Sequence, residues 1–120
     1  MAVWRILVLG LALSACATSE RISEIVILDS EQMQAVQQGV KRGLPYPDSA
    51  IFLPMSAGRI AQGILVCGNV STKSGASSTS GFRPYRGVLV GSTFTLDQYG
   101  DETSKADRIR LSCLSQGVII

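Results

Sequence analysis

A short apolar segment near the start of the chain limits how much of the protein is expected to fold. Residues 6–13 are apolar, they follow the single cation Arg5, and they lead through small residues to Cys16. A membrane-spanning helix needs about 20 apolar residues, so a permanent transmembrane anchor is the weakest interpretation. A charged start, an apolar core and a small-residue end are typical of a cleaved export signal. The folded part is therefore expected to begin near residue 16 and to form a single small domain.

The residues Leu13, Ser14, Ala15 and Cys16 resemble the lipobox of bacterial lipoproteins. The resemblance implies that a diacylglycerol is attached to the thiol of Cys16, that residues 1–15 are removed as a signal peptide, and that the new amino terminus is acylated, for example with palmitate. Ala17, in place of Asp, resembles the pattern of lipoproteins sent to the outer membrane, where the protein would face the periplasm. Residues 16–24 would then be a lipidated tether and residues 25–120 a single domain.

Ordinary signal cleavage is the alternative to lipidation. Ala15-Cys16-Ala17 also forms an A-x-A site, and cleavage after Ala17 would release a soluble exported protein. Lipidation would instead hold the protein at the membrane without spanning it, because two or three acyl chains bind a bilayer far more firmly than one chain.

The chain has three cysteines, which is an odd number for an exported protein. Lipidation uses Cys16 and ordinary cleavage discards it, so both routes leave Cys67 and Cys113 as a pair in an oxidising compartment. We therefore expect a disulfide between them, worth roughly 4 kcal/mol in the chain-entropy model. Two buried free thiols remain the alternative.

One helix is expected near the start of the domain. Asp29 followed by Gln32 resembles a capping box, and apolar residues then recur at helical spacing. The helix should run from about residue 30 to 42, because Gly43 suits its end and the prolines that follow prevent continuation.

Strands are expected after the helix, at residues 50–55, 60–70, 86–96 and around 109–113. The first is a short candidate, the second has consecutive apolar residues and should be a central strand, and the last two show alternation. In the last, Cys113 alternates with Arg110 and Ser112 and should face the core. The expected class is α+β, with one N-terminal helix packed on an antiparallel sheet of three to five strands and with both cysteines on neighbouring strands.

A second resemblance covers about residues 33–96. Residues 66–70, Val-Cys-Gly-Asn-Val, are followed by Lys73 and by residues 81–85, Gly-Phe-Arg-Pro-Tyr. This is similar to a V-C-G-x-V … G-F-x-P-aromatic pattern of small proteobacterial secreted proteins and lipoproteins of unassigned function. Residues 48–52 resemble the D-S-A-x-F stretch that precedes it in that group. The resemblance implies no particular reaction.

The residue types argue against catalysis. The chain has no histidine, so Ser-His and Cys-His pairs and imidazole metal ligands are excluded. The acidic cluster at residues 97–107 does not have the alternating oxygens of a calcium loop, and the chain has no Gly-rich phosphate loop. We expect no enzymatic activity, no metal and no cofactor, and the small net charge gives no reason to expect a nucleic-acid partner.

Positive charge is nevertheless concentrated in one half of the sequence. There is no acidic residue between Asp48 and Asp97, and around residues 81–87 arginines, aromatic residues and a proline coincide. A ligand patch that could bind carboxylate or phosphate groups is therefore predicted, composed of Lys73, Arg83, Tyr85 and Arg86. The alternative is structural, with these charges balanced by acids of other segments and with the aromatic residues covering the sheet.

Two functional classes remain. The first is a non-enzymatic envelope lipoprotein, a binding or structural module that contacts the membrane through its lipid and contacts an anionic envelope component or another envelope protein. The second is a small inhibitor or protective protein, in which the Ser/Gly-rich loop at residues 74–81 or the basic strand after it blocks the active site of an exported enzyme.

Overall fold

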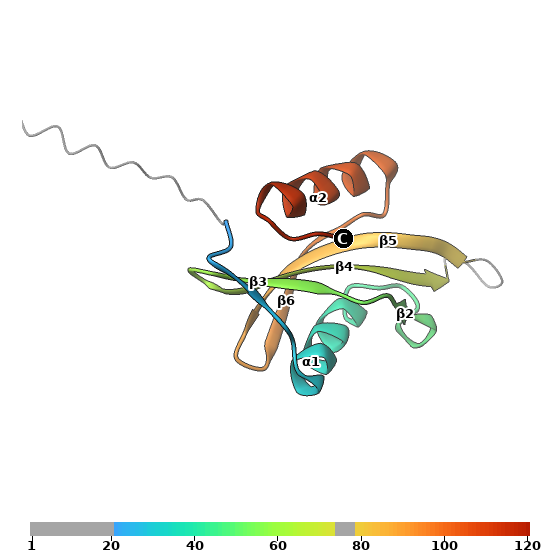
Figure 1. The fold of residues 1–120 in the computed structure, drawn as a ribbon. Helices are drawn as coiled ribbons and strands as arrows, with labels where there is room; N and C mark the ends of the chain where they lie inside the picture. The colour runs from blue at the N-terminus through green and yellow to red at the C-terminus, as the bar shows by residue number, and fades with distance from the viewer. Residues whose placement is uncertain (1–20, 74–78) are drawn as a thin grey trace, which may run out of the picture.

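Six strands form one antiparallel sheet, and one α-helix covers each of its two faces (Figure 1). This architecture belongs to the computed structural model of the chain, which describes residues 21–73 and 79–120. The lipobox with Cys16, and most of the Ser/Gly-rich loop, lie outside the described residues. The α+β class with a small antiparallel sheet is confirmed.

The sheet has β4 at its centre. Its strand order is β1-β3-β4-β5-β6. The short strand β2 pairs with Val70 and Ser71 of β4, beyond the residues of β4 that pair with β3. Leu65, Val66 and Cys67 in β4 are fully buried, which confirms that this apolar run is a central strand. The bounds of the strands are β1 Glu24–Val26, β2 Ile51–Phe52, β3 Ser56–Ile60, β4 Gly63–Lys73, β5 Thr79–Val90 and β6 Thr93–Tyr99.

Helix α1 covers Ser30–Lys41, where the sequence predicts a helix. Its start is fixed by a capping box: the backbone N–H of Gln32 donates to Asp29 Oδ1 at 2.7 Å, and the backbone N–H of Asp29 donates to Gln32 Oε1 at 3.0 Å. Val36 and Val40 are fully buried against the sheet. The prolines after the helix lead into a 3-10 turn at Pro47–Ser49.

The expectation of a single N-terminal helix is wrong, because a second helix lies at the C-terminus. Helix α2 covers Thr103–Ser115, where the sequence suggested a strand. Its buried residues, Ala106, Ile109 and Cys113, are three and four positions apart, whereas Leu111 is 66% exposed. The period of burial is therefore that of a helix, and the alternation around residue 111 is coincidental.

The predicted strands at residues 60–70 and 86–96 also needed correction, because each contains a tight turn. The turns fall at residues 61–62 and 91–92 and join β3 to β4 and β5 to β6 as hairpins. Gly91 adopts a φ of 60°, which favours glycine. The strand predicted at residues 50–55 is reduced to β2. The described sheet thus has six strands instead of three to five.

Alternate residues of the sheet serve two separate cores. The larger core lies between the sheet and α1 and includes Val66, Leu89 and Phe94; the smaller one lies between the sheet and α2 and includes Leu65 and Ile109. The disulfide between Cys67 and Cys113 belongs to the smaller core, and its Cα atoms are 6.4 Å apart. The pairing is confirmed, but it joins β4 to α2 and does not join neighbouring strands.

Candidate functional site

The four residues of the predicted ligand patch do not form one surface. Tyr85 is fully buried on the α1 side, where the rings of Phe52 and Phe94 meet it edge-on at centroid distances of 6.1 and 6.4 Å. Its hydroxyl has no hydrogen-bond partner among the described residues, and burial raises the pKa of the phenol well above its usual value. Neighbouring residues of a strand point to opposite faces, so Arg86 is buried on the α2 side.

Arg86 is itself buried and belongs to a partly buried polar network. Its Nη1 donates to Asp97 Oδ2 at 2.9 Å and its Nη2 donates to Gln116 Oε1 at 3.1 Å. In the same way, Arg59 Nε donates to Glu24 Oε1 at 2.6 Å. Acids from outside the basic stretch therefore balance two of its charges, and the structural alternative holds for these residues.

The remaining two patch residues lie nearer the outer end of the β4–β5 hairpin. Arg83 is half-buried, and its Nη1 donates to the backbone carbonyl of Asp101. Lys73 is exposed at the end of β4, and its backbone N–H donates to Ser49 Oγ at 2.9 Å. Only these two members of the predicted patch keep side chains that a ligand could reach.

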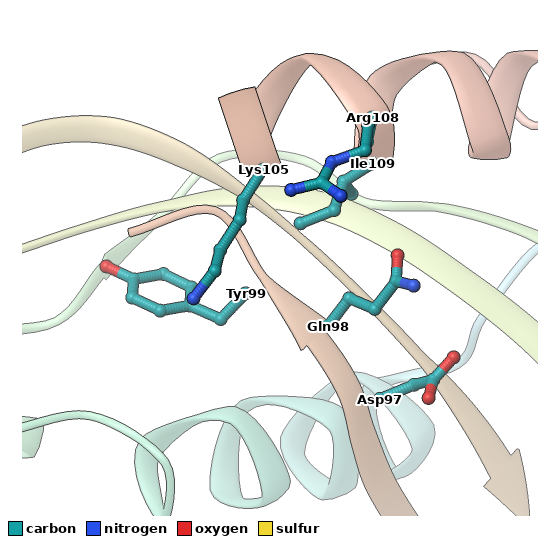
Figure 2. Close-up of a pocket in the computed structure, with 6 residues that line it drawn as sticks. All are labelled: Asp97, Gln98, Tyr99, Lys105, Arg108 and Ile109. Atoms are coloured by element: carbon teal, nitrogen blue, oxygen red, sulfur yellow. The ribbon is translucent and has the colours of Figure 1, made fainter. Parts of the chain in front are cut away.

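A different cationic hollow lies between β6 and α2 (Figure 2). It has a volume of about 350 Å³. Asp97, Gln98 and Tyr99 line it from the strand, and Lys105, Arg108 and Ile109 line it from the helix. Apart from the Asp97 carboxylate and the apolar Ile109, its side chains carry hydrogen-bond donors. These groups could donate hydrogen bonds to a carboxylate, phosphate or sulfate. Sequence reasoning missed this site because it assigned residues 108–113 to a strand, which removed the helix that brings the two cations beside β6.

The cations of this hollow already have contacts within the protein. Lys105 Nζ lies 3.2 Å from Asp101 Oδ1, one helical turn away, and Arg108 Nε donates to the carbonyl of Ser104 at 3.3 Å. Both contacts are exposed. The first is an ion pair, and exposed ion pairs contribute about 1 kcal/mol or less; the second is a hydrogen bond to a backbone carbonyl, which contributes about as little. A ligand could therefore displace them at small cost.

A second, apolar hollow lies at the opposite edge of the sheet. It has a volume of about 510 Å³. Its lining comes from β1 and the residues that follow it, from Met33 of α1, from the start of β3 and the segment before it, and from the C-terminal tail. We call Ile25, Ile27 and Ile119 the apolar lip; all three line this hollow and are 80%, 93% and 72% exposed. Of the described residues that line it, none is charged.

Neither hollow has the groups of a metal site, since the part of the chain that the structure describes contains no cluster of three or more His, Cys, Asp or Glu side chains able to hold a metal ion. In residues 21–73 and 79–120, no helix is both long and apolar enough to cross a membrane. Comparison of the chain with family models, curated proteins and solved structures found no match.

Proposed function

We propose that this protein is a non-enzymatic lipoprotein of the bacterial cell envelope, anchored through acyl chains on Cys16, with a folded domain that acts as a binding or structural module. The observation that carries the proposal is the pairing of the cysteines. Cys67 and Cys113 are joined in the small core, and the chain has three cysteines. The one left over is Cys16, the residue that lipidation would use. Disulfides persist in oxidising compartments, which agrees with export.

The start of the domain also suits a short anchor. The backbone N–H of Ile22 donates to the backbone carbonyl of Gln116 at 3.1 Å, and the backbone N–H of Ser23 donates to the backbone carbonyl of Arg59 at 2.8 Å. Residues 22 and 23 are therefore already attached to the domain, so the tether to Cys16 is shorter than the sequence suggested. A tether of this length would keep the domain close to the membrane.

The best-supported ligand site of the module is the cationic hollow between β6 and α2. Its lining includes two cations, an amide, a phenol and one carboxylate, that of Asp97, which is paired with Arg86. The two cations therefore outnumber the single acid, which suits an anionic envelope component. This proposal replaces the predicted patch, because Tyr85 and Arg86 are buried.

Fatty-acid labelling tests the proposed anchor. Bacteria expressing the full chain are grown with labelled palmitate, and the wild type should be labelled, shortened by residues 1–15 and recovered with the outer membrane. Cys16→Ala should be unlabelled and unprocessed. The matched control is the double variant Cys67→Ala/Cys113→Ala, which loses the disulfide but should still be labelled. Normal maturation of Cys16→Ala, with both proteins in the soluble exported fraction, would contradict the proposal.

A second candidate function, inhibition of an exported enzyme, is favoured by the shape of the β4–β5 hairpin. β6 pairs with β5 only from Tyr85 to Val90, so the hairpin extends beyond β6, and Phe82 on this extension is exposed. If the hairpin blocks an active site, Phe82→Ser should release an exported hydrolase that the wild-type protein captures and inhibits. Capture of the hydrolase with its activity unchanged would contradict inhibition.

A further inference from the structure

The apolar lip exposes large aliphatic side chains in one place. Ile25 and Ile27 are two residues apart and strongly exposed. Val26 and Leu28, between and after them, pack against the larger core. Ile119 of the C-terminal tail lines the same hollow. Apolar surface that is contiguous and exposed marks a site of contact with a protein or a membrane.

The attachment point of the tether lies beside this lip. Ile22 packs against Gly58 in β3 and against Gly117, and Gly117 lines the apolar hollow. Six residue steps separate Cys16 from Ile22, and even a fully extended chain spans at most about 3.5 Å per step, or roughly 20 Å in all. An acylated Cys16 would therefore hold the lip close to the bilayer surface.

We propose that the apolar lip inserts into the lipid surface to which Cys16 is anchored. The inference rests on the proposed lipoprotein function and names a contact that the anchor alone would not supply. Aliphatic side chains at the end of a short tether would enter the boundary between headgroups and acyl chains, as the apolar face of an interfacial segment does. Because the lining of the hollow has no charge, insertion should depend little on salt or on anionic lipid.

This contact would orient the domain. β1 is one end of the sheet order and β6 is the other. If the β1 edge rests on the bilayer, the cationic hollow beside β6 is turned away from it, toward the compartment that holds ligands. The lip and the hollow would then have complementary roles, one for placement and one for binding.

A second copy of the chain fits the apolar lip less well than a bilayer does. β1 has three residues, which is short for a strand that would add to another sheet, and the lip extends beyond β1 to Ile27 and to the C-terminal tail. A bilayer accepts such an irregular apolar surface without a matched shape.

Tryptophan fluorescence provides a direct test, because the sequence has one tryptophan, Trp4, and it lies in the segment that processing removes. The mature, acylated variants Ile27→Trp and Leu111→Trp are each placed in vesicles of phosphatidylethanolamine and phosphatidylglycerol with brominated acyl chains. Both positions are exposed, so both variants should fold. Emission from Ile27→Trp should be shifted to shorter wavelength and quenched by about twofold or more, whereas Leu111→Trp should be unaffected.

The outcomes separate the inference from the proposed function. If mass spectrometry shows acylated Cys16 and Ile27→Trp is quenched no more than Leu111→Trp, insertion is wrong and the lipoprotein proposal stands. A shift to shorter wavelength without quenching by bromine would mean that protein covers the lip, and this too would overturn the inference. Absence of acyl chains on Cys16 would overturn the proposed function itself.

A second pair of variants tests the lip without a reporter. In vesicle-bound protein, Ile25→Ser/Ile27→Ser should let trypsin cut after Arg21 several times faster than in the wild type, because the domain would no longer rest on the bilayer. Leu111→Ser is the matched control and should be cut at the wild-type rate. Equal rates for all three proteins would contradict insertion.

Discussion

Arg86 and Asp97 form an ion pair whose two members differ greatly in exposure. Arg86 Nη1 lies 2.9 Å from Asp97 Oδ2, yet the Arg86 side chain is 7% exposed and the Asp97 side chain is 53% exposed. Removing one partner of a buried pair is costly when it leaves the other buried and uncompensated. Mutation of Asp97 and mutation of Arg86 should therefore lower the stability of the protein by different amounts.

We expect Asp97→Ala to lower the free energy of unfolding by about 2 kcal/mol, somewhat below the usual cost for fully buried pairs because the carboxylate is half-exposed. Arg86→Met should cost less, because the carboxylate that it leaves can be solvated. Urea unfolding measures both. Asp107→Ala, which breaks an exposed pair with Arg110, is the control and should change the free energy by roughly 0.5 kcal/mol or less. A larger loss for Arg86→Met than for Asp97→Ala would contradict this account.

Loss of the disulfide should be the most destabilising change. The bridge closes a loop with a sequence separation of 46, for which the chain-entropy model gives roughly 4 kcal/mol. Reduction, or the double variant Cys67→Ala/Cys113→Ala, should lower the melting temperature markedly and increase hydrogen exchange first in α2. An unchanged melting temperature after reduction would show that the bridge contributes nothing.

Tyr85→Phe should make the protein more stable. The Tyr85 hydroxyl is buried without a hydrogen-bond partner among the described residues, and such a group costs about 1–3 kcal/mol. We expect a gain of about 1 kcal/mol in the free energy of unfolding at neutral pH. Tyr46→Phe, at an exposed position, is the control and should have no effect.

The same residue should affect stability at alkaline pH. Burial raises the pKa of Tyr85 in the folded protein, while the unfolded chain releases the proton near pH 10. Ionisation of Tyr85 therefore leaves the free energy of unfolding unchanged below that pH and lowers it as pH rises above it. The reason is that the unfolded state then binds fewer protons than the folded state. Denaturant titrations at increasing pH should show a steeper loss for the wild type than for Tyr85→Phe. Parallel curves would contradict this assignment.

Gly39→Ala should destabilise the protein although it lies in a helix. An alanine normally improves a helix by about 1 kcal/mol relative to glycine, but a Cβ at Gly39 would collide with the backbone carbonyl and the ring of Phe94 in β6. Overpacking of this kind costs about 1–3 kcal/mol, so the net change should be unfavourable. Gln34→Ala on the exposed side of α1 provides the control. A stabilised Gly39→Ala would mean that α1 does not lie so close to β6.

The features predicted correctly are those that neighbouring residues determine. The capping box at Asp29 needs only residues within one helical turn, and the apolar run in β4 is long enough to indicate a central strand. The disulfide followed from the parity of the cysteines. None of these inferences required knowledge of tertiary packing.

The strand predicted around residues 109–113 was wrong because the same residues fit both the two-residue period of a strand and the period of a helix. Ile109 and Cys113 are compatible with alternation and with a helical face, and only burial of Ala106 and exposure of Leu111 decide between them. The turn at Gly91 was a signal that the sequence offered and that the prediction of one strand over residues 86–96 overlooked. The same holds for the ligand patch, since adjacent residues of a strand, such as Tyr85 and Arg86, cannot share a face.

The position of the disulfide has a consequence for the order of events during synthesis of the proposed lipoprotein. It joins the middle of the sheet to the last helix, so in an exported chain Cys67 would leave the export channel well before its partner. During that interval the other thiol already outside would be that of Cys16. In the proposed lipoprotein, acylation of Cys16 would block its thiol and prevent a disulfide between Cys16 and Cys67. Cys67 would then stay reduced until Cys113 is exported. Attachment to the membrane would thus also protect the correct pairing of the domain that is still being exported.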